Sequence, residues 1–483
     1  MTALWTAADI VAATGGAARR DFAAGGVSID SRTVARGDLF VALQGPNFDG
    51  HAFVGDALAK GAAGALVAPS SATLPADLPG DAPLVVVGDT LAALTALGRA
   101  ARRRSLARII AVTGSVGKTG TKEALRLALS GQGLTHASVG SFNNQWGVPL
   151  SLARMPRDAA FGIFELGMNH AGELAELSPI ARPHVALITT IEAAHLGYFA
   201  SLEAIADAKA EIFDGVEPGG AAVLNRDNAH FARLAAAAKR RGIARILDFG
   251  EHREAAVRLL DCQLAATTSA VTASVMGEAL DYTLALPGRH WVMNSLAVLG
   301  AVKAVGGDVG AAAASFAQLT GLPGRGLRHT VALPGGSFDL IDESYNASPA
   351  AVRAAIAVLG AADIALGGRR IAVLGNMLEL GADSARLHAE LADPLVKARI
   401  ARVYTVGDDM ALLHAALPAR LRGEHRATSS EMAEIIAAAL RPGDVVTVKG
   451  SLGSRMAIIV KRLLAPPLRA GTTISSIPCA AAE

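Results

Sequence analysis

The segment 109–121 constrains the fold of this chain more than any other. A short β-branched run, 109–112, stops at a glycine-rich loop, and a helical pattern starts at Lys118. A strand that passes through such a loop into a helix is the setting in which backbone N–H groups and a helix N-terminus bind polyphosphate. The segment therefore predicts an α/β domain with a phosphate-binding loop. The loop residues are Gly114, Ser115, Val116 and Gly117.

The first two helical residues, Lys118 and Thr119, carry side chains suited to a bound nucleotide. A lysine at this place supplies charge to the β- and γ-phosphates of ATP, and a threonine hydroxyl ligates Mg²⁺. The loop is slightly shorter than the usual phosphate-loop pattern, so a tight turn with an exposed lysine is the alternative. The strand before the loop and the helix after it favour ATP binding.

The composition is typical of a folded protein with several domains. At 483 residues the chain exceeds what one hydrophobic core supports, so about two to four domains are expected. Apolar residues make up 51% and charged residues 18%, which excludes global disorder. The net charge is +2, aromatic residues are 4%, and no basic stripe is present, so nucleic acid is not expected as a partner.

The sequence predicts a cytoplasmic protein. Asp9 interrupts the apolar N-terminal stretch, which argues against a signal peptide. The longest apolar run, 292–305, contains polar residues and falls short of membrane-spanning length, so no membrane partner is expected. The two cysteines, Cys262 and Cys479, lie far apart, as expected of a reducing compartment.

Changes of pattern divide the chain into three blocks. The first, 1–89, mixes short strands with turns, whereas the second, 106–323, and the third, 324–466, alternate strands with helices. Such alternation predicts mostly parallel sheets. The expected fold is α/β with three domains: a small α/β domain, a central phosphate-loop ATPase domain and a C-terminal Rossmann-like domain.

Hydrophobic periodicity also places the individual elements. The expected strands are 39–43, 62–67, 109–113, 160–165, 185–190, 220–225, 245–249, 338–342, 370–374, 402–406 and 444–448. The expected helices include 90–104, 201–213, 349–359 and 385–397.

Two strands of the central block lead to residues that could bind a cation. Strand 160–165 ends at Glu165, and His195 follows strand 185–190. Ligands of open α/β sheets lie beyond the carboxyl ends of the strands, so both side chains are expected near the phosphate loop. A carboxylate and an imidazole there would suit a second divalent cation. Taken singly, a helix cap and a structural histidine explain them better.

Lys209 lies on the apolar stripe of the helix predicted over 201–213. It follows Ile205 by four residues and precedes Phe213 by four. From the residues alone the simpler interpretation is a lysine that extends its ammonium from the edge of the stripe into solvent. The alternative is a lysine held inward, because burial would lower its pKa. Its neutral amine could then react with CO₂, and the carbamate could ligate a cation.

These residues, together with several other segments, resemble the ATP-dependent Mur ligases of peptidoglycan synthesis. The resemblance covers nearly the whole chain. The segment 345–349, Tyr-Asn-Ala-Ser-Pro, separates this branch of the family from the ligase that adds the third amino acid. The similar segments are 27–32, 47–51, 113–122, 143–150, 165–173, 194–196, 209–213, 345–349, 375–381 and 449–451.

The resemblance implies a role for individual residues, and it implies that Lys209 is held inward. Catalysis would use Lys118, Glu165, His195 and Lys209. The metal ligands would be Thr119, Glu165, His195 and carbamylated Lys209. ATP would contact the phosphate loop, Asn294, Arg325, Asp342 and Glu343. The UDP-linked substrate would contact Ser31, Arg32, Asp49 and His51. The acceptor side of the third domain would use Tyr345, Asn346, Lys449 and Ser451.

The resemblance also implies an activity. The chain would be an ATP- and Mg²⁺-dependent amide ligase that joins D-alanyl-D-alanine to UDP-N-acetylmuramoyl-tripeptide through an acyl phosphate, and it would act as a monomer. Two alternatives stay open: another Mur-type or folate polyglutamate-type amide ligase, and a nucleotide-binding homologue without catalysis. The joint presence of the predicted catalytic residues argues against the second alternative.

Five positions depart from the family pattern. Gly120 stands in place of threonine, and Asn376 stands in place of aspartate. Trp291 and Ser348 stand in place of asparagine, and Ala457 stands in place of glutamate. Gly120 falls in the first turn of the predicted helix, where glycine costs little stability.

Overall fold

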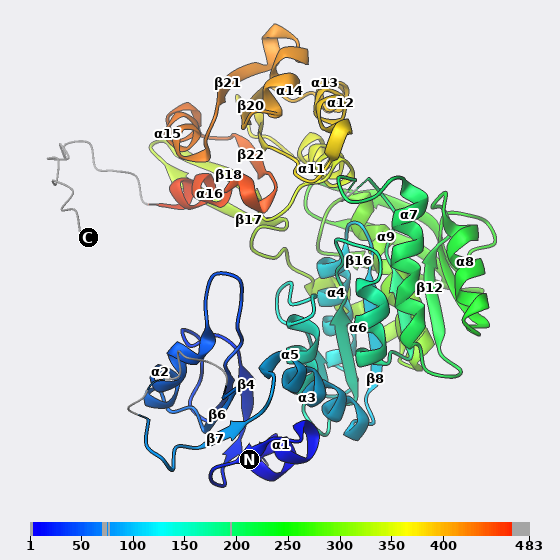
Figure 1. Cartoon of the computed structure of the whole chain (residues 1–483). Coiled ribbons are helices and arrows are strands. Elements are labelled where there is room, and N and C mark those ends of the chain that lie inside the picture. The colour runs from blue at the N-terminus through cyan, green and yellow to red at the C-terminus, as the bar shows by residue number, and fades with distance from the viewer. Residues whose placement is uncertain (1–2, 70–74, 76–77, 194–195, 466–483) are drawn as a thin grey trace, which may run out of the picture. The chain divides into compact units, whose positions relative to one another are not determined.

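The computed structural model describes residues 3–69, 75, 78–193 and 196–465, which form two compact units (Figure 1). The first unit comprises the residues up to Thr320 together with Glu379–Gly381, and the second comprises Gly321–Leu378 and the residues from Ala382 onward. The division falls close to the predicted start of the third block. The boundaries of the three predicted domains stay a prediction.

The N-terminal part of the first unit is a small α/β layer structure. Its elements are β1 Trp5–Thr6, α1 Ala7–Thr14, β2 Ala17–Ala18, β3 Ala23–Ala24, β4 Gly26–Ser28, β5 Asp38–Val41, α2 Val54–Ala59, β6 Gly64–Val67, β7 Leu84–Val86 and α3 Thr90–Arg104. Five strands form a sheet in the order β2-β7-β6-β5-β4, and only the β2–β7 pair is antiparallel. The predicted helix 90–104 is confirmed, and the Asp89 side chain caps it by accepting a hydrogen bond from the Ala92 N–H.

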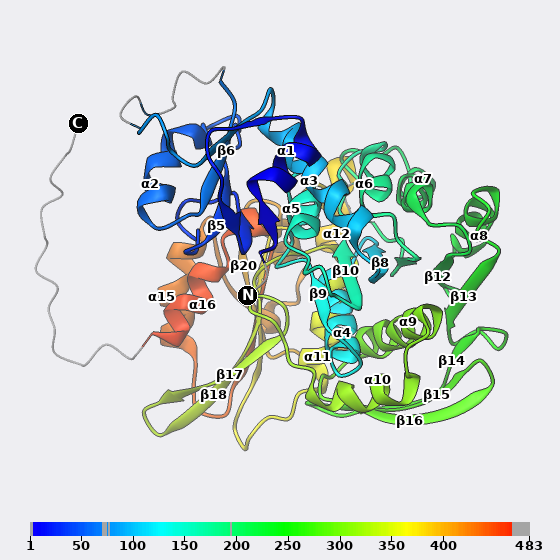
Figure 2. The ribbon, with the colours of Figure 1, turned by 90° about the horizontal axis from the view of Figure 1, so that it is seen from below.

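The rest of the first unit is built around a nine-stranded sheet. Its elements are β8 Arg108–Thr113, α4 Lys118–Ser130, β9 Thr135–Ala137, α5 Gly147–Ala153, β10 Phe161–Glu165, α6 Glu173–Ala181, β11 Val185–Ile188, α7 Leu202–Ala210, β12 Ala221–Asn225, α8 Phe231–Arg240, β13 Arg245–Gly250, β14 Val257–Leu264, β15 Ser269–Val275, β16 Glu278–Leu284, α9 Arg289–Val305 and α10 Val309–Ser315. The strand order is β16-β15-β14-β13-β12-β11-β8-β10-β9. The pairs from β9 to β14 are parallel, as predicted, and β14, β15 and β16 form an antiparallel meander that was not predicted (Figure 2).

Helices cover both faces of this sheet because the buried strand residues alternate between two cores. Ile110 and Val112 of β8 pack in one core with α4, α9 and α10. Ile109 and Ala111 pack in the other core with α5, α6, α7 and α8. Successive side chains of a strand point to opposite faces, so a strand buried on both faces reads as a continuous apolar run.

The second unit contains a six-stranded sheet in the order β17-β18-β22-β19-β20-β21. Its elements are β17 Leu327–Leu333, β18 Gly336–Glu343, α11 Pro349–Ala361, β19 Arg370–Gly375, α12 Ser384–Ala389, α13 Ala392–Lys397, β20 Arg402–Val406, α14 Met410–Ala416, β21 Arg422–Arg426, α15 Ser429–Ala439, β22 Val445–Lys449 and α16 Ala457–Leu464. All pairs are parallel except β17–β18. The strands and helices alternate, as the predicted α/β fold requires.

Several predicted elements differ from the structure. The helix expected over 201–213 consists of α7, which ends at Ala210, and the 3-10 helix Glu211–Gly215. The strand expected over 39–43 ends at Val41, and the one expected over 62–67 starts at Gly64. The helix expected over 385–397 is divided into α12 and α13, because Pro394 has no N–H for the Glu390 carbonyl and would clash with it in a continuous helix. The strand expected over 185–190 ends at Ile188. The next residue, Thr189, instead contacts the phosphate loop.

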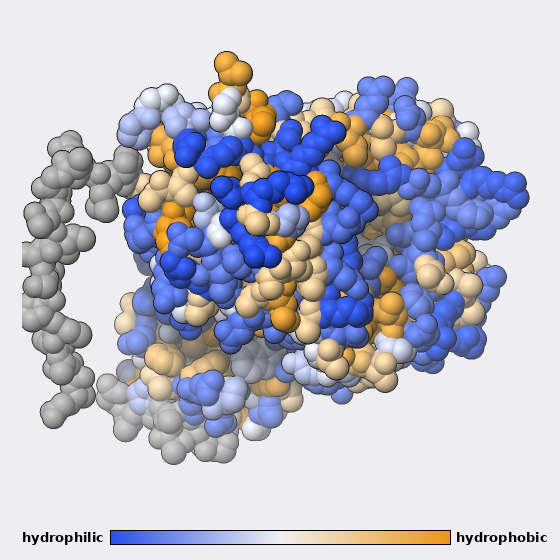
Figure 3. All heavy atoms as spheres, turned by 90° about the horizontal axis from the view of Figure 1, so that it is seen from above, coloured by the Kyte–Doolittle hydropathy of each residue, from blue (hydrophilic) through white to orange (hydrophobic). Residues whose placement is uncertain are grey.

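The surface is mixed in polarity. On the face shown in Figure 3, hydrophilic residues surround smaller groups of hydrophobic ones. Across the part of the chain that the structure describes, we find no helix whose length and apolar character would let it span a membrane.

Candidate active site

The loop between β8 and α4 has the backbone conformation of a phosphate-binding turn. Gly114 and Gly117 have φ values of 144° and 88°, which favour glycine. A β-carbon on Gly114 would lie 1.9 Å from Thr189 Oγ1, so no other residue fits there. Lys118 Nζ donates a hydrogen bond of 2.7 Å to the Gly114 carbonyl, which keeps the lysine folded over the loop.

The segment after β11 braces this loop from the side. Thr189 Oγ1 donates a hydrogen bond of 2.6 Å to the Val116 carbonyl. Ser115 Oγ donates to the Glu192 carbonyl and accepts the Glu192 N–H, both at 3.0 Å. The side chain of Ser115 therefore holds the shape of the loop, and its contact with ATP stays a prediction.

Glu165 lies at the phosphate loop, because β10 is the parallel neighbour of β8 and pairs Glu165 with Val112. The side chain is 1% exposed. Its Oε2 accepts a hydrogen bond of 2.9 Å from Thr119 Oγ1, and its Oε1 accepts one of 2.8 Å from Asn143 Nδ2. Asn143 belongs to the paired asparagines of segment 143–150. These contacts fix both carboxylate oxygens beside the first turn of α4.

Lys209, near the end of α7, is buried with 1% of its surface exposed. The interpretation of a lysine that extends into solvent is therefore wrong. Burial, and next the positive charge of Lys118, lower the pKa of Lys209 well below its usual value. Within the described ranges its amine forms no hydrogen bond or ion pair. A lowered pKa favours the neutral amine, which is the chemical form that carbamylation requires.

His195 lies outside the described residues, so its predicted part in the metal site stays a prediction. The described ranges contain no group of three or more His, Cys, Asp or Glu side chains arranged to hold a metal ion. Thr119 and Glu165 nevertheless place a hydroxyl and a carboxylate next to each other at the phosphate loop. These hard oxygen donors fit Mg²⁺. This ion needs only a few protein ligands, because water molecules and substrate phosphates fill its other coordination positions.

Lys122 is a residue of this site that the sequence interpretation missed. It lies on α4, one turn after Lys118, and is 0% exposed. Its Nζ donates hydrogen bonds to the carbonyls of Ser138, at 2.7 Å, and Gly140, at 2.8 Å. Lys122 thereby ties α4 to the loop that leads to Asn143. The signal in the sequence was its position on the apolar side of the helix, one turn before Leu125.

The first turns of α9 lie against the start of α4. A β-carbon on Gly117 would be 3.1 Å from Asn294 Oδ1, so the predicted ATP contact Asn294 does lie beside the phosphate loop. A β-carbon on Gly120 would be 2.8 Å from Trp291 Cη2. Two of the departures from the family pattern, Gly120 and Trp291, are therefore in contact with each other.

In the N-terminal part, the predicted UDP contacts form local networks. The Arg32 guanidinium donates two hydrogen bonds to the Asp30 carboxylate, from Nε to Oδ1 at 2.9 Å and from Nη2 to Oδ2 at 2.7 Å. These hydrogen bonds lower the pKa of Asp30 to about 2. Ser31 offers its carbonyl to Lys60 Nζ at 2.7 Å. Both Ser31 and Arg32 are accessible enough to bind a ligand, and Arg32 has further N–H groups available to an anion.

Asp49 and His51 contribute to the fold of the same region. His51 is 2% exposed, its Nε2 accepts the Ala68 N–H at 2.9 Å, and its Nδ1 lies 2.6 Å from Asp49 Oδ1. The Asp49 side chain also accepts the His51 N–H and so caps the short turn Gly50–Phe53. Both ring nitrogens of His51 are therefore engaged within the protein, and a substrate contact for this pair stays a prediction.

In the second unit, polar residues gather at the carboxyl edge of the six-stranded sheet. β18 and β22 pair Glu343 with Lys449, and Lys449 Nζ donates to Glu343 Oε2 and to the Asn346 carbonyl, both at 3.0 Å. Lys449 is 3% exposed. Ser451 Oγ donates to the Ala347 carbonyl at 3.3 Å, so both predicted acceptor residues hold the segment that contains Asn346.

Asp342 fixes the start of this unit. Its carboxylate accepts hydrogen bonds from the Gly324 N–H, the Ser344 N–H and Ser344 Oγ, at 2.8, 3.1 and 2.6 Å. The Arg325 guanidinium lies 4.3 Å from the ring centroid of Tyr345. These contacts occupy much of Asp342, whereas Glu343 keeps a partly exposed carboxylate for a ligand.

Two other departures have structural roles here. Ser348 caps α11 by accepting the Ala351 N–H, which is a favourable role for serine. Asn376 Oδ1 accepts the Met410 N–H at 3.2 Å. Nothing in the structure explains Ala457 in place of glutamate.

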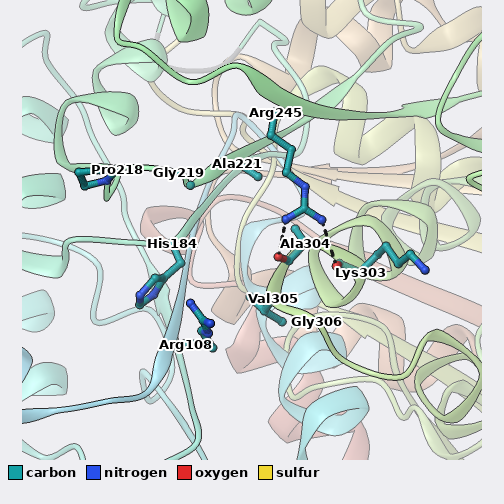
Figure 4. Close-up of a pocket in the computed structure, with 11 residues that line it drawn as sticks. Arg108, His184, Pro218, Gly219, Ala221, Arg245, Lys303, Ala304, Val305 and Gly306 are labelled. Atoms are coloured by element: carbon teal, nitrogen blue, oxygen red, sulfur yellow. Dashed lines mark hydrogen bonds between the residues drawn. The ribbon is translucent and has the colours of Figure 1, made fainter.

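A cavity of about 350 Å³ lies at the opposite, amino-terminal edge of the nine-stranded sheet (Figure 4). Arg108, His184 and Arg245 line it beside the last turn of α9. The Arg245 guanidinium donates to the carbonyls of Lys303, at 3.3 Å, and Ala304, at 2.9 Å, as the dashed lines in Figure 4 show. Arg245 therefore caps the end of α9. The predicted residues of the phosphate site do not line this cavity.

The parallel sheet, the loop with its lysine and the carboxylate on the neighbouring strand define a phosphate-loop nucleotide-binding protein. Comparison with known proteins specifies the family. The Mur ligase middle domain matches residues 112–302, the glutamate ligase domain of Mur ligases matches 330–452, and the Mur ligase family catalytic domain matches 24–102. The chain belongs to the Mur ligase family.

Individual relatives resemble the chain over nearly its full length. UDP-N-acetylmuramoyl-tripeptide--D-alanyl-D-alanine ligase of Escherichia coli (strain K12) is 34% identical over 90% of this chain and 93% of the relative. The crystal structure of MurF from Acinetobacter baumannii has a TM-score of 0.81 and 29% identity, with 95% of this chain and 98% of that chain covered. MurF ligase from Thermotoga maritima in complex with ADP has a TM-score of 0.74 and 26% identity, with 91% and 96% covered.

Proposed function

We propose that this chain is an ATP-dependent amide ligase that joins D-alanyl-D-alanine to UDP-N-acetylmuramoyl-tripeptide in peptidoglycan synthesis. One observation carries the proposal: directly after the phosphate loop, Thr119 donates a hydrogen bond to the buried Glu165 carboxylate, and Lys118 donates one to the loop carbonyl of Gly114. The similarity to known ligases extends along nearly the whole chain, and the reaction of those ligases supplies the proposed substrates. The proposal includes a monomeric enzyme that acts in the cytoplasm.

The chemistry answers a thermodynamic problem. A carboxylate does not condense with an amine in water, because its oxygen is a poor leaving group. ATP would transfer its γ-phosphoryl group to the terminal carboxylate of the tripeptide, giving an acyl phosphate and ADP. The amine of D-alanyl-D-alanine would then attack the acyl carbon, form the C–N bond and lose a proton, and phosphate would leave with one former carboxylate oxygen.

The residues of the phosphate site would serve the first of these steps. Lys118 would hold the β- and γ-phosphates, and the N–H groups at the start of α4 would bind the same anion. Mg²⁺ bound with ATP supplies charge neutralisation for the transferring phosphoryl group. Thr119 would hold a first Mg²⁺, and Glu165 and His195 would serve a second. The fixed hydrogen-bonded arrangement of Thr119 and Glu165 means that little reorganisation is needed when ATP binds.

Lys209 would complete the set of oxygen donors after carbamylation. Its neutral amine would add to CO₂, form a C–N bond and release one proton, which leaves a carboxylate at the end of a long side chain. The lowered pKa supports this reaction, because an ammonium has no lone pair to attack with. An anionic carbamate would also compensate the nearby charge of Lys118.

The other predicted contacts would bind the ends of the substrates. Ser31 and Arg32 would bind the UDP moiety, with Asp49 and His51 shaping the loop beside it. Asn294 would lie near the adenine, and Arg325, Asp342 and Glu343 would contact phosphate and ribose. Tyr345, Asn346, Lys449 and Ser451 would form the acceptor side.

The test is product formation by the full chain with ATP, Mg²⁺, UDP-N-acetylmuramoyl-tripeptide and D-alanyl-D-alanine. We expect one UDP-linked pentapeptide, identified by mass spectrometry, for each phosphate released, and no product when any one substrate is omitted. Lys118→Ala should be inactive, whereas the matched control Lys239→Ala, an exposed lysine of α8, should keep full activity. Rapid turnover without the dipeptide, or with a folate and glutamate instead, would contradict the proposal.

A further inference from the structure

Two contacts join α9 to the first turn of α4, and they are repeated at the same spacing. Asn294 lies against Gly117, and Trp291 lies against Gly120. Trp291 and Asn294 are three residues apart on α9 and so lie on one helix face, whereas Gly117 is the N-cap residue that precedes α4 and Gly120 lies in its first turn. The contact between the helices therefore continues directly from the phosphate loop into the helix that follows it.

Gly120 is a glycine because the indole of Trp291 occupies the space of its side chain. A β-carbon at position 120 would lie 2.8 Å from Cη2, 3.2 Å from Cζ3 and 3.5 Å from Cζ2. These three atoms belong to the benzene ring of the indole, so this edge of the ring faces α4. The backbone of Gly120 is helical, and its conformation alone does not require glycine.

The partly buried side chain of Trp291 packs against the hydrophobic core of the first unit. It packs on the cluster that contains Leu125 of α4 and the fully buried Val292 and Leu296 of α9. A large aromatic side chain held in this way is a rigid spacer, because it has only two rotatable bonds and little room to move. Its contact with Gly120 fixes how closely α9 approaches the start of α4.

We propose that Trp291 is a positioning residue for nucleotide binding. Its ring sets the separation between α9 and α4, and so holds Asn294 against Gly117 at the mouth of the phosphate loop. Positions 120 and 291 then form one unit: the large ring needs glycine opposite it, and glycine without the ring leaves a gap. The inference rests on the proposed function only in taking ATP as the nucleotide.

The experiment is a double-mutant cycle on ATP affinity, measured by calorimetry on the full chain with Mg²⁺ and no other substrate. Gly120→Thr forces a side chain against the ring, and Trp291→Asn removes the spacer, so each should weaken ATP binding about tenfold. The combined variant replaces glycine and a large ring by two residues of intermediate size, and should bind ATP within about threefold of the native chain.

Further measurements separate positioning from a loss of folding. In activity assays the KM for ATP should rise in both single variants, whereas the KM for D-alanyl-D-alanine stays within about twofold. Trp291→Phe, which keeps an aromatic ring but does not reach as far, should lie between the native chain and Trp291→Asn. Leu106→Asn, at a side chain that is 96% exposed, is the control for introducing asparagine.

Two results would overturn the inference. One is unchanged ATP affinity in Trp291→Asn, provided that the thermal unfolding midpoint shows a folded protein. The other is a combined variant whose loss of affinity is the product of the two single losses, because independent sites behave in that way. A chain that binds ATP as described but makes no pentapeptide would refute the proposed ligase function and leave this inference intact.

Discussion

Thr119 and Glu165 are separated by 46 residues in the sequence, yet a hydrogen bond of 2.9 Å joins their side chains. The bond exists because β8 and β10 are parallel neighbours, which brings the start of α4 and the end of β10 to one edge of the sheet. Asn143 holds the other carboxylate oxygen at 2.8 Å. The acidic group of the site is therefore fixed in place by the fold itself.

Glu165→Gln should lower kcat by about 100-fold, because it removes the charge that would hold the cation while it preserves shape. The amide can still accept from Asn143 and donate to Thr119, so the thermal midpoint should stay within about 2 °C. Steady-state kinetics and thermal unfolding measure the two effects. Glu176→Gln, at an exposed carboxylate of α6, is the matched control and should change neither. A fully active Glu165→Gln variant would show that the charge of Glu165 is not needed to hold the cation.

Lys209→Ala should be nearly inactive in the ligase assay and should regain part of its activity with a short carboxylic acid such as propionate. The small acid would occupy the space of the missing side chain and replace the carbamate oxygens. Addition of the same acid to Lys118→Ala should give no rescue, because that variant lacks a positively charged ammonium group and a carboxylate cannot replace it. Equal rates for Lys209→Ala and the native chain, with or without acid, would contradict carbamylation.

Lys209→Met should stabilise the chain in bicarbonate-free buffer, and the gain should shrink as the pH rises. The folded-state pKa of Lys209 is lowered, so its burial costs most below that pKa and costs nothing above the unfolded value of 10.5. Between these pKa values folding releases a proton. The free energy of unfolding of the native chain therefore rises, relative to that of the variant, by up to about 1.4 kcal/mol per pH unit. Urea unfolding at several pH values measures this difference. A difference independent of pH, or a gain that grows with pH, would refute the neutral buried amine.

Lys122→Met should destabilise the first unit by about 2 to 4 kcal/mol, because two carbonyls lose the charged donor that satisfies them. The released loop also carries Asn143, so kcat should fall together with stability. Urea unfolding and the ligase assay measure these effects. Arg126→Met, on the exposed side of the same helix, should change stability by less than about 0.5 kcal/mol. Similar effects for the two variants would show that Lys122 does not hold the loop.

Asp444→Asn should destabilise the second unit by about 2 to 4 kcal/mol. Asp444 is 1% exposed and accepts both arms of the Arg369 guanidinium, at 3.1 and 2.7 Å, together with the backbone N–H groups of Arg369 and Arg441. Asparagine can accept on one oxygen alone. The exposed pair Asp393–Lys397 supplies the control Asp393→Asn, for which little change is expected. An Asp444→Asn variant with native urea resistance would contradict the role of this pair.

Much of the fold could be predicted because parallel strands buried on both faces give continuous apolar runs. β8, β10, β12 and β20 begin or end within one residue of their predicted bounds. The meander of β14, β15 and β16 was missed although β15 alternates buried and more exposed residues, since a bulge between Leu259 and Asp261 breaks the period in β14. The pattern was present but interrupted.

The site could be predicted in part. Chain topology placed Glu165 beside the phosphate loop, because the carboxyl ends of neighbouring parallel strands must meet. The periodicity of apolar residues along a helix does not show how deeply a polar side chain on that face is buried. The structure was therefore needed to decide whether Lys209 is buried or extends into solvent. Ser115 and His51 show the converse limit: polar residues in a segment that resembles a family motif can serve the backbone around them. The contact between Gly120 and Trp291 joins positions 171 residues apart, and no local pattern predicts it.

The most direct test of the account follows an oxygen atom. UDP-N-acetylmuramoyl-tripeptide labelled with ¹⁸O in its terminal carboxylate is converted with ATP, Mg²⁺ and D-alanyl-D-alanine, and the released phosphate is analysed by mass spectrometry. Activation of the carboxylate by phosphoryl transfer predicts one ¹⁸O atom in each phosphate formed with the pentapeptide. Phosphate without the label would show that the oxygen came from water, and that this site hydrolyses ATP without activating the acid.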